Sequence, residues 1–312
     1  MSKGTVTVFG GSGFLGRYVV RRLANLGWTI RVAVRRPSRA AFLQPLGDVG
    51  QITPLACDVR DAAQGQRALA GSQAVVNLVG ILYEEGRQSF AAVQYQGAKT
   101  VATAAAALGI TQFVQISALG VSPQSSSDYS RSKAAAEQAV LAAIPQARIV
   151  RPSIIFGAED DFFNRFAGLA RLSPFLPLIG GGHSCFQPVY VGDVADGIVT
   201  ALDSAASAGQ IYELGGPEVA TFKELMQLLL LQIRRKRLLL PLPFALASFQ
   251  AWFLEKLPHP LLTRDQVKLL KQDNVVSGDY PGFEDLGLQP TTMQTILPTY
   301  LDRYRPGGKR QP

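Results

Sequence analysis

The chain has 312 residues, of which 47% are hydrophobic and 17% charged, so it can bury a sizeable core and lacks the composition of a disordered protein. Its two cysteines and two histidines are too few for a disulfide framework, and no metal site is expected. The net charge is +8, but no basic run is interleaved with regularly placed aromatics. Nucleic-acid binding is therefore not expected, whereas an acidic protein partner or an anionic membrane surface stays open.

The first predicted element is a strand over 5–9, which runs into a glycine-rich turn and then an amphipathic helix that Gly27 would end. Gly10, Gly13 and Gly16 have the spacing G-x-x-G-x-x-G. In a dinucleotide-binding turn these glycines permit the sharp turn, the approach of the pyrophosphate and the packing of helix on strand. The helix N-terminus adds N–H groups that favour an anion. The turn residues expected to bind the ligand are Gly10, Ser12, Gly13, Phe14, Leu15 and Gly16.

Further strands alternate with helical patterns as far as residue 157, with one helix expected over 129–143. Such alternation implies right-handed βαβ units. The predicted fold class is therefore α/β, a Rossmann-type doubly wound parallel sheet. The strands expected after the first are 29–34, 52–57, 74–80, 113–117 and 147–150.

Beyond residue 157 proline becomes frequent and the alternation loosens, which predicts a smaller, helix-rich C-terminal domain. Within this part, 187–202 again has the pattern of a strand and then a helix, and it is expected to return to the main sheet. The expected boundaries are 1–157 for the Rossmann domain, with 186–214 returning to it, 158–185 and 215–304 for the smaller domain, and 305–312 for a flexible tail.

The apolar run 238–254 is short for a spanning helix, and it contains Pro241 and Pro243. One interpretation is a strand end followed by a core helix from Phe244. The other is an amphipathic helix on a membrane or a hydrophobic partner, with the basic run 234–237 facing anionic headgroups. No transmembrane helix is expected. Because the glycine motif starts almost at the first residue, the sequence predicts no secretory signal and favours a cytoplasmic protein.

The choice of cofactor depends on the end of the second strand. NAD-selecting enzymes place an acidic residue there to accept a hydrogen bond from the ribose 2′-hydroxyl. This chain has Arg35 and Arg36 instead, and the planar guanidinium fork suits the oxygens of a 2′-phosphate. NADP(H) is therefore the predicted cofactor. Asp58, at the end of the third strand, is expected to accept a hydrogen bond from the adenine amino group.

The candidate catalytic residues are Tyr129, Lys133 and Ser117. Tyr129 and Lys133 form Y-x-x-x-K, one helical turn apart, and Ser117 ends the fifth strand. A nearby ammonium would favour the tyrosine phenolate, so Tyr129 could exchange a proton while hydride passes between the nicotinamide and a carbonyl carbon. Ser117 could hydrogen-bond the carbonyl oxygen. Alternatively, the tyrosine and the lysine only bind the cofactor.

Together these residues resemble the extended and atypical short-chain dehydrogenases/reductases over nearly the whole chain. Further segments narrow the resemblance to the NADPH-binding accessory subunits of respiratory complex I and their bacterial relatives. The Asn-Arg-Phe and Thr-Arg-Asp-Gln-Val segments are the most specific. The segments that carry the resemblance are 8–17, 151–157 with Glu159 and Asp160, 163–166, 187–191 with Asp193 and Val194, 241–243 and 262–267.

The resemblance implies tight NADPH binding without redox turnover, and a role in assembly or stability beside the ubiquinone-binding region. It implies subunits of a respiratory quinone oxidoreductase as partners, and a position at a membrane surface. Because the first strand starts almost at Met1, a bacterial source is favoured, so the expected place is peripheral on the cytoplasmic face of the inner membrane. It also assigns Tyr129 and Lys133 to the nicotinamide ribose. The other cofactor-binding residues that it implies are Val59, Leu78, Val79, Gly80 and Pro152.

Three departures from active extended enzymes bear on turnover. Ala118 stands where a second serine or threonine is usual, the loop between Ser117 and Tyr129 is short, and Gln94 replaces a common asparagine. Two hypotheses follow. The chain is an NADPH-bound accessory or assembly protein of complex I, or it is an active NADP-dependent reductase or epimerase on a quinone, an isoprenoid or another apolar substrate.

Overall fold

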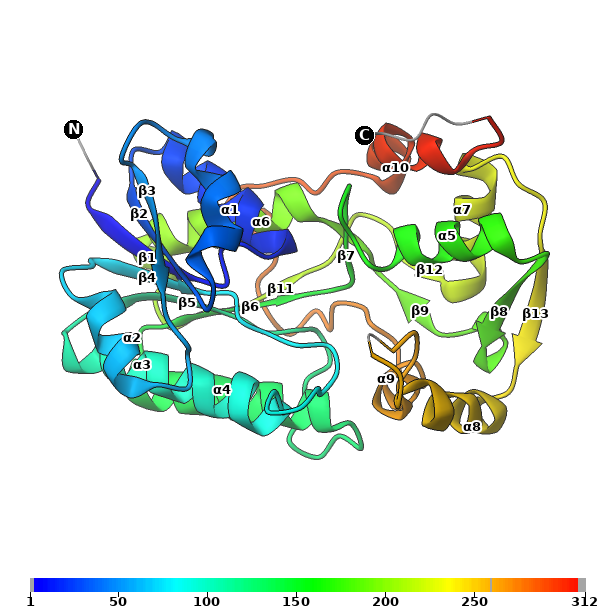
Figure 1. Cartoon of the computed structure of the whole chain (residues 1–312), viewed down its shortest axis with the longest axis horizontal. Helices are drawn as coiled ribbons and strands as arrows, with labels where there is room; N and C mark the ends of the chain where they lie inside the picture. Colours follow the sequence, from blue (N-terminus) through cyan, green and yellow to red (C-terminus); the bar gives the residue numbers. More distant parts are fainter. Residues whose placement is uncertain (1–2, 259, 308–312) are drawn as a thin grey trace. The chain divides into compact units, whose positions relative to one another are not determined.

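The computed structural model describes residues 3–258 and 260–307, which form two compact units (Figure 1). The first, called here the Rossmann unit, takes the chain up to Pro152 together with Gly192–Leu214 and Gly278–Leu288. The second unit takes Ser153–Val191, Gly215–Ser277 and the chain from Gln289 onward. No helix in these described ranges is both long enough and apolar enough to cross a membrane.

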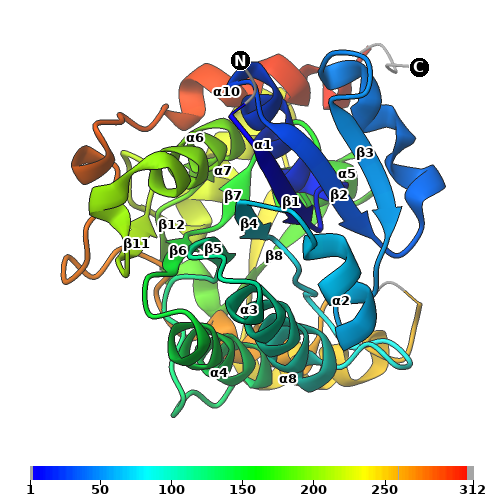
Figure 2. The same ribbon diagram turned by 90° about the vertical axis from the view of Figure 1, so that its left-hand side faces the viewer.

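The Rossmann unit is built on a seven-stranded sheet of order β11-β6-β5-β4-β1-β2-β3, and every neighbouring pair in it is parallel. Helices cover both faces of the sheet. In both views α1 and α6 lie on one face, and α2, α3 and α4 lie on the other (Figures 1 and 2). This is the predicted doubly wound Rossmann-type architecture. The strands are β1 (Thr5–Phe9), β2 (Thr29–Val34), β3 (Ile52–Ala56), β4 (Ala74–Asn77), β5 (Gln112–Ile116), β6 (Arg148–Pro152) and β11 (Ile211–Leu214).

Small side chains let the helices approach this sheet closely. Helix α3 presents Ala98, Ala102 and Ala105 to a core that includes Phe113 and Ile149 of the sheet. The inner strands β1, β4, β5 and β6 are almost wholly buried, because a parallel sheet covered by helices has no wet face. The helices are α1 (Phe14–Asn25), α2 (Ala62–Leu69), α3 (Gly97–Ala107), α4 (Asp128–Ala143) and α6 (Val191–Asp203).

The second unit contains short strand pairs and five helices among its described residues, around a core rich in phenylalanine and leucine, such as Phe163, Phe222 and Leu229. Its strands pair as β7 with β10, β9 with β12, and β8 with β13. They are β7 (Ile155–Phe156), β8 (Phe175–Ile179), β9 (Cys185–Phe186), β10 (Val189–Tyr190), β12 (Ala220–Thr221) and β13 (Leu238–Leu242). The helices are α5 (Phe163–Leu172), α7 (Phe222–Gln232), α8 (Phe244–Leu254), α9 (Arg264–Leu269) and α10 (Met293–Leu301).

A buried hydrogen-bond network joins the start of the second unit to its last helix. The Asp160 carboxylate accepts hydrogen bonds from the backbone N–H groups of Gly157 and Asn164, both at 3.0 Å, and from the Tyr300 hydroxyl at 2.6 Å. The Asn164 side-chain oxygen in turn accepts from Arg303 and Tyr304. Burial raises the pKa of Asp160, while the bond from Tyr300 opposes that rise. These contacts hold α10 in place.

Two expectations for this part of the chain are wrong. The strand in 187–202 does not join the main sheet, because β10 pairs with β7; β11 occupies the edge of the sheet instead. Helix α8 forms in the apolar run, but only Ala247 and Ala251 of it are buried, so of the two interpretations of this run the core helix is wrong. A flexible tail was expected over 305–312. Its first residue, Arg305, donates a hydrogen bond to the Gln232 carbonyl at 2.9 Å. Residues 308–312 lie outside the described part of the chain.

Candidate functional site

The glycine turn between β1 and α1 has a shape that side chains would not permit. Gly10 has φ +74°, and the Gly13 N–H donates to its carbonyl at 3.0 Å. A Cβ on Gly16 would stand 2.4 Å from the Gly10 carbonyl oxygen, and one on Gly11 would stand 2.9 Å from a Val32 methyl. Gly13 is the N-cap of α1 and has no side chain to occupy the first N–H groups of the helix. The turn therefore leaves a backbone cradle for an anion.

The end of β4 lies directly beside this turn. The Leu78 N–H donates to the Phe9 carbonyl at 3.0 Å, and a Cβ on Gly10 would stand 3.2 Å from the Leu78 carbonyl carbon. Leu78 and Val79 are half-buried and Gly80 is exposed. The structure thus brings Leu78 and Val79, which follow β4 and were predicted to contact a cofactor, to the first glycine.

At the ends of β2 and β3, charged side chains take the places predicted for the adenosine half. Arg35 and Arg36 are both exposed, and Arg35 donates to the Gln88 side chain at 2.5 Å. Both oxygens of Asp58 accept from Arg60, at 2.9 and 2.6 Å, which holds the pKa of that carboxyl below its usual value. Arg60 was not predicted. The first oxygen, Oδ1, also accepts from the Arg60 backbone N–H at 3.0 Å, so the lone pair that remains for an amino donor is on Oδ2.

Lys133 projects from α4 into the interior at the end of the sheet. It is only 4% exposed, its ammonium donates to the Ile116 carbonyl at 3.3 Å, and a Cβ on Gly80 would stand 3.3 Å from its Nζ. Desolvation lowers the pKa of Lys133 to about 8, although Glu137 opposes the shift. Lys133 is thus held between the ends of β4 and β5. From there its ammonium could donate hydrogen bonds to the hydroxyls of a ribose.

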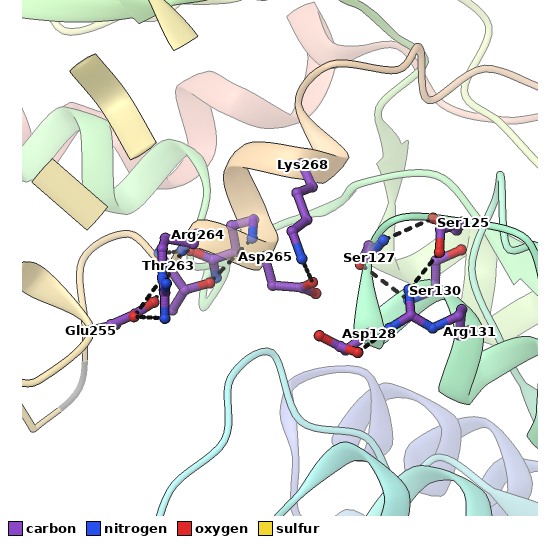
Figure 3. A network of polar contacts seen from close by, with 11 residues as sticks. Ser125, Ser127, Asp128, Ser130, Arg131, Glu255, Thr263, Arg264, Asp265 and Lys268 are labelled. Atoms are coloured by element: carbon purple, nitrogen blue, oxygen red, sulfur yellow. Dashed lines mark hydrogen bonds and ion pairs between the residues drawn. The ribbon is translucent and has the colours of Figure 1, made fainter. Parts of the chain in front are cut away.

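Tyr129 lies in the first turn of α4, which begins after the N-cap Ser127; the side chain of Ser127 accepts from the Ser130 N–H (Figure 3). Burial raises the pKa of the Tyr129 phenol to about 12. The expectation that a lysine favours the phenolate is therefore wrong for the chain by itself. At neutral pH the phenol keeps its proton, which suits a hydrogen-bond or proton donor.

Ser117 and Pro152 complete the same edge of the sheet. The Ser117 N–H donates to the Val150 carbonyl at 2.7 Å, and the Leu119 N–H donates to the Pro152 carbonyl at 3.0 Å. The buried Ser117 hydroxyl has no hydrogen-bond partner within the described chain. A buried hydroxyl without a partner costs about 1–3 kcal/mol, so a ligand atom that bonds to it would recover that free energy.

The described residues contain two further buried polar side chains that sequence reasoning did not assign to the site. Asn77 and Gln115 face each other across β4 and β5, with a hydrogen bond of 2.8 Å between their amides. Asn77 also accepts from the Val79 N–H, and Gln115 donates to the Ile116 carbonyl. These bonds fix the backbone at Val79, after β4, and at Ile116, whose carbonyl also accepts from Lys133. The sequence contained a signal for these two residues, since each is a polar side chain at the carboxyl end of an otherwise apolar strand.

The side chain of Gln94 lies in a single turn of π-helix, Ala91–Gln96. Its amide nitrogen reaches the Ile81 carbonyl at 3.4 Å, and its buried amide oxygen has no partner in the residues that the structure describes. Such turns occur often at functional sites. In the ranges 3–258 and 260–307 no group of three histidine, cysteine or acidic residues could hold a metal ion.

The predicted residues therefore gather at one edge of one sheet. The strands are all parallel, so the segments that follow β1, β2, β3, β4, β5 and β6 meet at their carboxyl ends. A model of the NAD dependent epimerase/dehydratase family matches residues 6–215. The chain belongs to this family. Its members' name implies a nicotinamide dinucleotide, and the glycine cradle, the buried lysine and the Ser117 hydroxyl fit one.

Curated relatives match 64–97% of the chain. The Arabidopsis thaliana protein "NADH dehydrogenase [ubiquinone] 1 alpha subcomplex subunit 9, mitochondrial" is 40% identical over 314 residues, covering 97% of this chain and 78% of the relative. The Mus musculus protein of that name is 36% identical, covering 96% and 80%. A Caulobacter vibrioides "Ceramide reductase" is 38% identical over 204 residues, covering 64% of this chain and 61% of the relative.

Solved structures of the epimerase/dehydratase type share the fold. A dTDP-glucose 4,6-dehydratase from Streptomyces venezuelae with bound NAD superposes with a TM-score of 0.74 over 96% of each chain, at 21% identity. A nucleoside-diphosphate-sugar epimerase from Staphylococcus aureus has a TM-score of 0.75 over 94% of this chain and 99% of its own, at 16% identity. At these identities the likeness concerns the fold alone.

Proposed function

We propose that this protein is an NADPH-binding accessory or assembly protein of the respiratory NADH:ubiquinone oxidoreductase, in which NADPH is a structural ligand. The observation that carries the proposal is the extent of the similarity. The family match ends at residue 215, but the complex I relatives match 96–97% of the chain. The similarity therefore includes the second unit, where a partner-specific surface would lie.

The preference for NADPH rests on charge at the end of β2. Arg35 and Arg36 are exposed directly after this strand, and the chain has no acidic residue there to accept from a 2′-hydroxyl. Gln88 already accepts from Arg35, which orients the guanidinium. The rigid fork of arginine donates in pairs to phosphate oxygens. A 2′-phosphate would thus meet two guanidinium groups that donate hydrogen bonds to it. A free 2′-hydroxyl would find no carboxylate there to accept its hydrogen bond.

A structural role for the nucleotide agrees with the state of the residues around it. Lys133 is buried and Ser117 has a buried hydroxyl that a ligand could satisfy, so binding stabilises the folded chain. A ligand present at about 100 times its Kd adds about 2.7 kcal/mol to the free energy of unfolding. A bound nicotinamide would transfer hydride only if a substrate also bound beside it, so a structural nucleotide needs no turnover. Under this proposal Tyr129 and Lys133 bind the ribose.

The deciding experiment is extraction of the membranes with a gentle detergent, then native sizing and mass spectrometry of what migrates with the chain. We expect respiratory-chain subunits and near-equimolar NADPH. The Tyr129→Phe variant should keep both, and respiration should be unchanged. A soluble protein that exchanges NADPH freely, or loss of respiration in Tyr129→Phe with NADPH still bound, would contradict the proposal.

A second candidate is an active NADP-dependent reductase or epimerase on a quinone, an isoprenoid or another apolar substrate. Two observations favour it: the Tyr129 and Lys133 pair is intact, and a protein named ceramide reductase matches 64% of the chain. The phenol, with its pKa near 12, would donate a proton to the carbonyl oxygen that Ser117 hydrogen-bonds. In that case purified protein oxidises NADPH with such a substrate, and Tyr129→Phe abolishes the oxidation.

The proposed location follows from the proposed partners. Subunits of a respiratory quinone oxidoreductase work at a membrane, and this chain has a formal net charge of +8. We place it peripherally on the cytoplasmic face of a bacterial inner membrane, where anionic lipids attract basic proteins. Fractionation should find it with the membranes at low ionic strength, and washing at high salt should release part of it.

A further inference from the structure

Helix α8 buries its small side chains and exposes its large ones. Ala247 and Ala251 are fully buried in a cluster with Ile179 and Val267, whereas Phe249 is 60% exposed. A surface helix of a soluble protein normally turns its large apolar side chains toward the core. The helix is the last part of the apolar run that starts in β13, and Figure 1 shows it following that strand in the second unit.

The exposed side chains form an ordered cluster rather than scattered single residues. The ring centroids of Trp252 and Phe253 are 4.6 Å apart, and those of Phe249 and Phe253 are 5.1 Å apart. The Lys256 ammonium lies 3.8 Å from the Trp252 ring centroid. The α8 surface is defined here by side chains that are each at least 40% exposed: Leu246, Phe249, Trp252, Phe253, Leu257 and Leu261.

The apolar run is uncharged, and two lysines lie over its aromatic rings: Lys256 over Trp252 and Lys271 over Phe244. Residues 238–254 contain no charged side chain. Between 255 and 275 the chain has four lysines and arginines and three acidic residues. Two of those three are paired with cations, Glu255 with Arg264 at 2.6 Å and Asp265 with Lys268 at 3.7 Å (Figure 3). An apolar, aromatic surface with a cationic border complements an anionic bilayer.

We propose that the α8 surface is where this protein lies on an anionic lipid bilayer, with the helix parallel to the membrane. The inference rests on the proposed function, since it assigns the membrane contact to particular residues. Eleven residues of helix extend about 16 Å, too short to span the roughly 30 Å hydrocarbon core, so insertion is shallow. Trp252 takes the interfacial depth typical of tryptophan, and Lys256 extends its ammonium to the phosphates.

A bilayer fits this surface better than a protein subunit does. The outward face of α8 offers few hydrogen-bonding groups, which the polar rim of a protein interface would use. Two lysines, Lys256 and Lys271, lie over its aromatic rings, whereas protein interfaces deplete lysine. The α8 surface therefore has the composition of a membrane-surface helix, and contact with an apolar protein subunit becomes an outcome that the experiment must distinguish.

Tryptophan fluorescence can test the proposal because the chain has only two tryptophans. Trp28 is 3% exposed and lies in the Rossmann unit, so Trp28→Phe leaves Trp252 as the sole reporter. With phosphatidylglycerol vesicles we expect a blue shift of the emission and quenching by brominated acyl chains. Vesicle flotation should show binding at least tenfold tighter to phosphatidylglycerol than to phosphatidylcholine at low salt.

Two matched variants distinguish binding through the α8 surface from nonspecific hydrophobic adsorption to vesicles. The change Phe249→Ser with Phe253→Ser should weaken vesicle binding at least tenfold. The change Val219→Ser with Leu231→Ser also removes two exposed apolar side chains of the second unit, and it should leave binding within twofold. Circular dichroism and urea denaturation, compared with the unchanged protein, show whether both variants are folded. Unchanged binding in the α8 variant would overturn the proposal.

The outcomes also separate this inference from the proposed function. In one outcome the protein migrates with respiratory subunits and holds NADPH, but its Trp252 emission does not change when vesicles are added. This result would overturn the lipid contact and indicate that a subunit covers α8. A protein that binds vesicles through α8 but migrates alone would leave the lipid contact in place and contradict the accessory role.

Discussion

The two units use their most recognisable residues in different ways. In the Rossmann unit, the motif glycines and the tyrosine–lysine pair lie at the edge of the sheet where a ligand would bind. In the second unit, the motif residues bind other parts of the chain: Asp160 accepts from Tyr300, 140 positions away, and Thr263 caps α9 together with Gln266. A shared motif can therefore mark a scaffold as well as a chemical site.

The largest effect should come from the glycine turn, where the backbone leaves no room for a side chain. In Gly16→Val, the added atoms would collide with the carbonyl of Gly10, 2.4 Å from the new Cβ. We expect a loss of more than about 3 kcal/mol in the free energy of unfolding, and no bound nucleotide. Urea denaturation and nucleotide extraction would measure both.

A glycine with open space is the matched control. Gly65, in α2, has nothing within 4 Å of an added Cβ, so Gly65→Ala should stabilise the protein by about 0.5–1 kcal/mol. If Gly16→Val kept its nucleotide, the turn would not be the cradle proposed for it.

The next effect concerns cofactor choice in the Rossmann unit. Changing Arg35 and Arg36 together to alanine should raise the Kd for NADPH about 100-fold, because two charge-assisted contacts to the 2′-phosphate are lost. The Kd for NADH should change less than threefold. Calorimetric titration with each nucleotide measures the difference. Arg21→Ala, an exposed arginine on α1, is the control; equal weakening of NADPH and NADH would refute the assignment.

The scaffold role in the second unit predicts a loss of stability without a loss of nucleotide. Tyr300→Phe removes a 2.6 Å hydrogen bond to the buried Asp160 and should cost about 2 kcal/mol in the free energy of unfolding. Tyr212→Phe removes a bond between two neutral hydroxyls, at 2.8 Å to Ser207, and should cost about half as much. Chemical denaturation compares them, and equal losses would contradict a charge-assisted bond at Asp160.

The smallest effect is a pH dependence at Lys133. Its pKa falls from 10.5 in the unfolded chain to about 8 in the folded one, so the unfolded chain binds more protons in between. The free energy of unfolding should therefore rise with pH, by about 1.5 kcal/mol from pH 8 to 9.5 in nucleotide-free protein. Lys133→Met should remove this rise in urea denaturation. Parallel profiles of the two proteins would mean that Lys133 is not desolvated.

Local patterns predicted the Rossmann unit well, because its site follows from the order of elements along the chain. A strand, a glycine turn and a helix can be read within about 25 residues, and parallel strands bring their carboxyl ends to one edge. The state of the site was less predictable. The Tyr129 pKa rises to about 12 because of burial, a property that Y-x-x-x-K spacing does not contain.

Contacts between distant segments were beyond the sequence. Nothing near Asp160 shows that its partner is Tyr300, and the pairing of β10 with β7 depends on two strands of only two residues each. The sequence also left open whether α8 is a core helix or an exposed one, since an apolar run looks the same whether its large side chains point inward or outward. Only the two buried alanines of α8 distinguish these cases.

The path of the chain has a consequence for synthesis. The sheet receives its last strand, β11, only after the first segment of the second unit, and the N–H of Glu213 in that strand then donates to Pro281. A nascent chain that ends at Pro152 has all the strands except β11, so β6 stays an open edge on the ribosome. Until residue 214 has emerged, an unpaired β6 therefore ends the sheet at the place that β11 later takes.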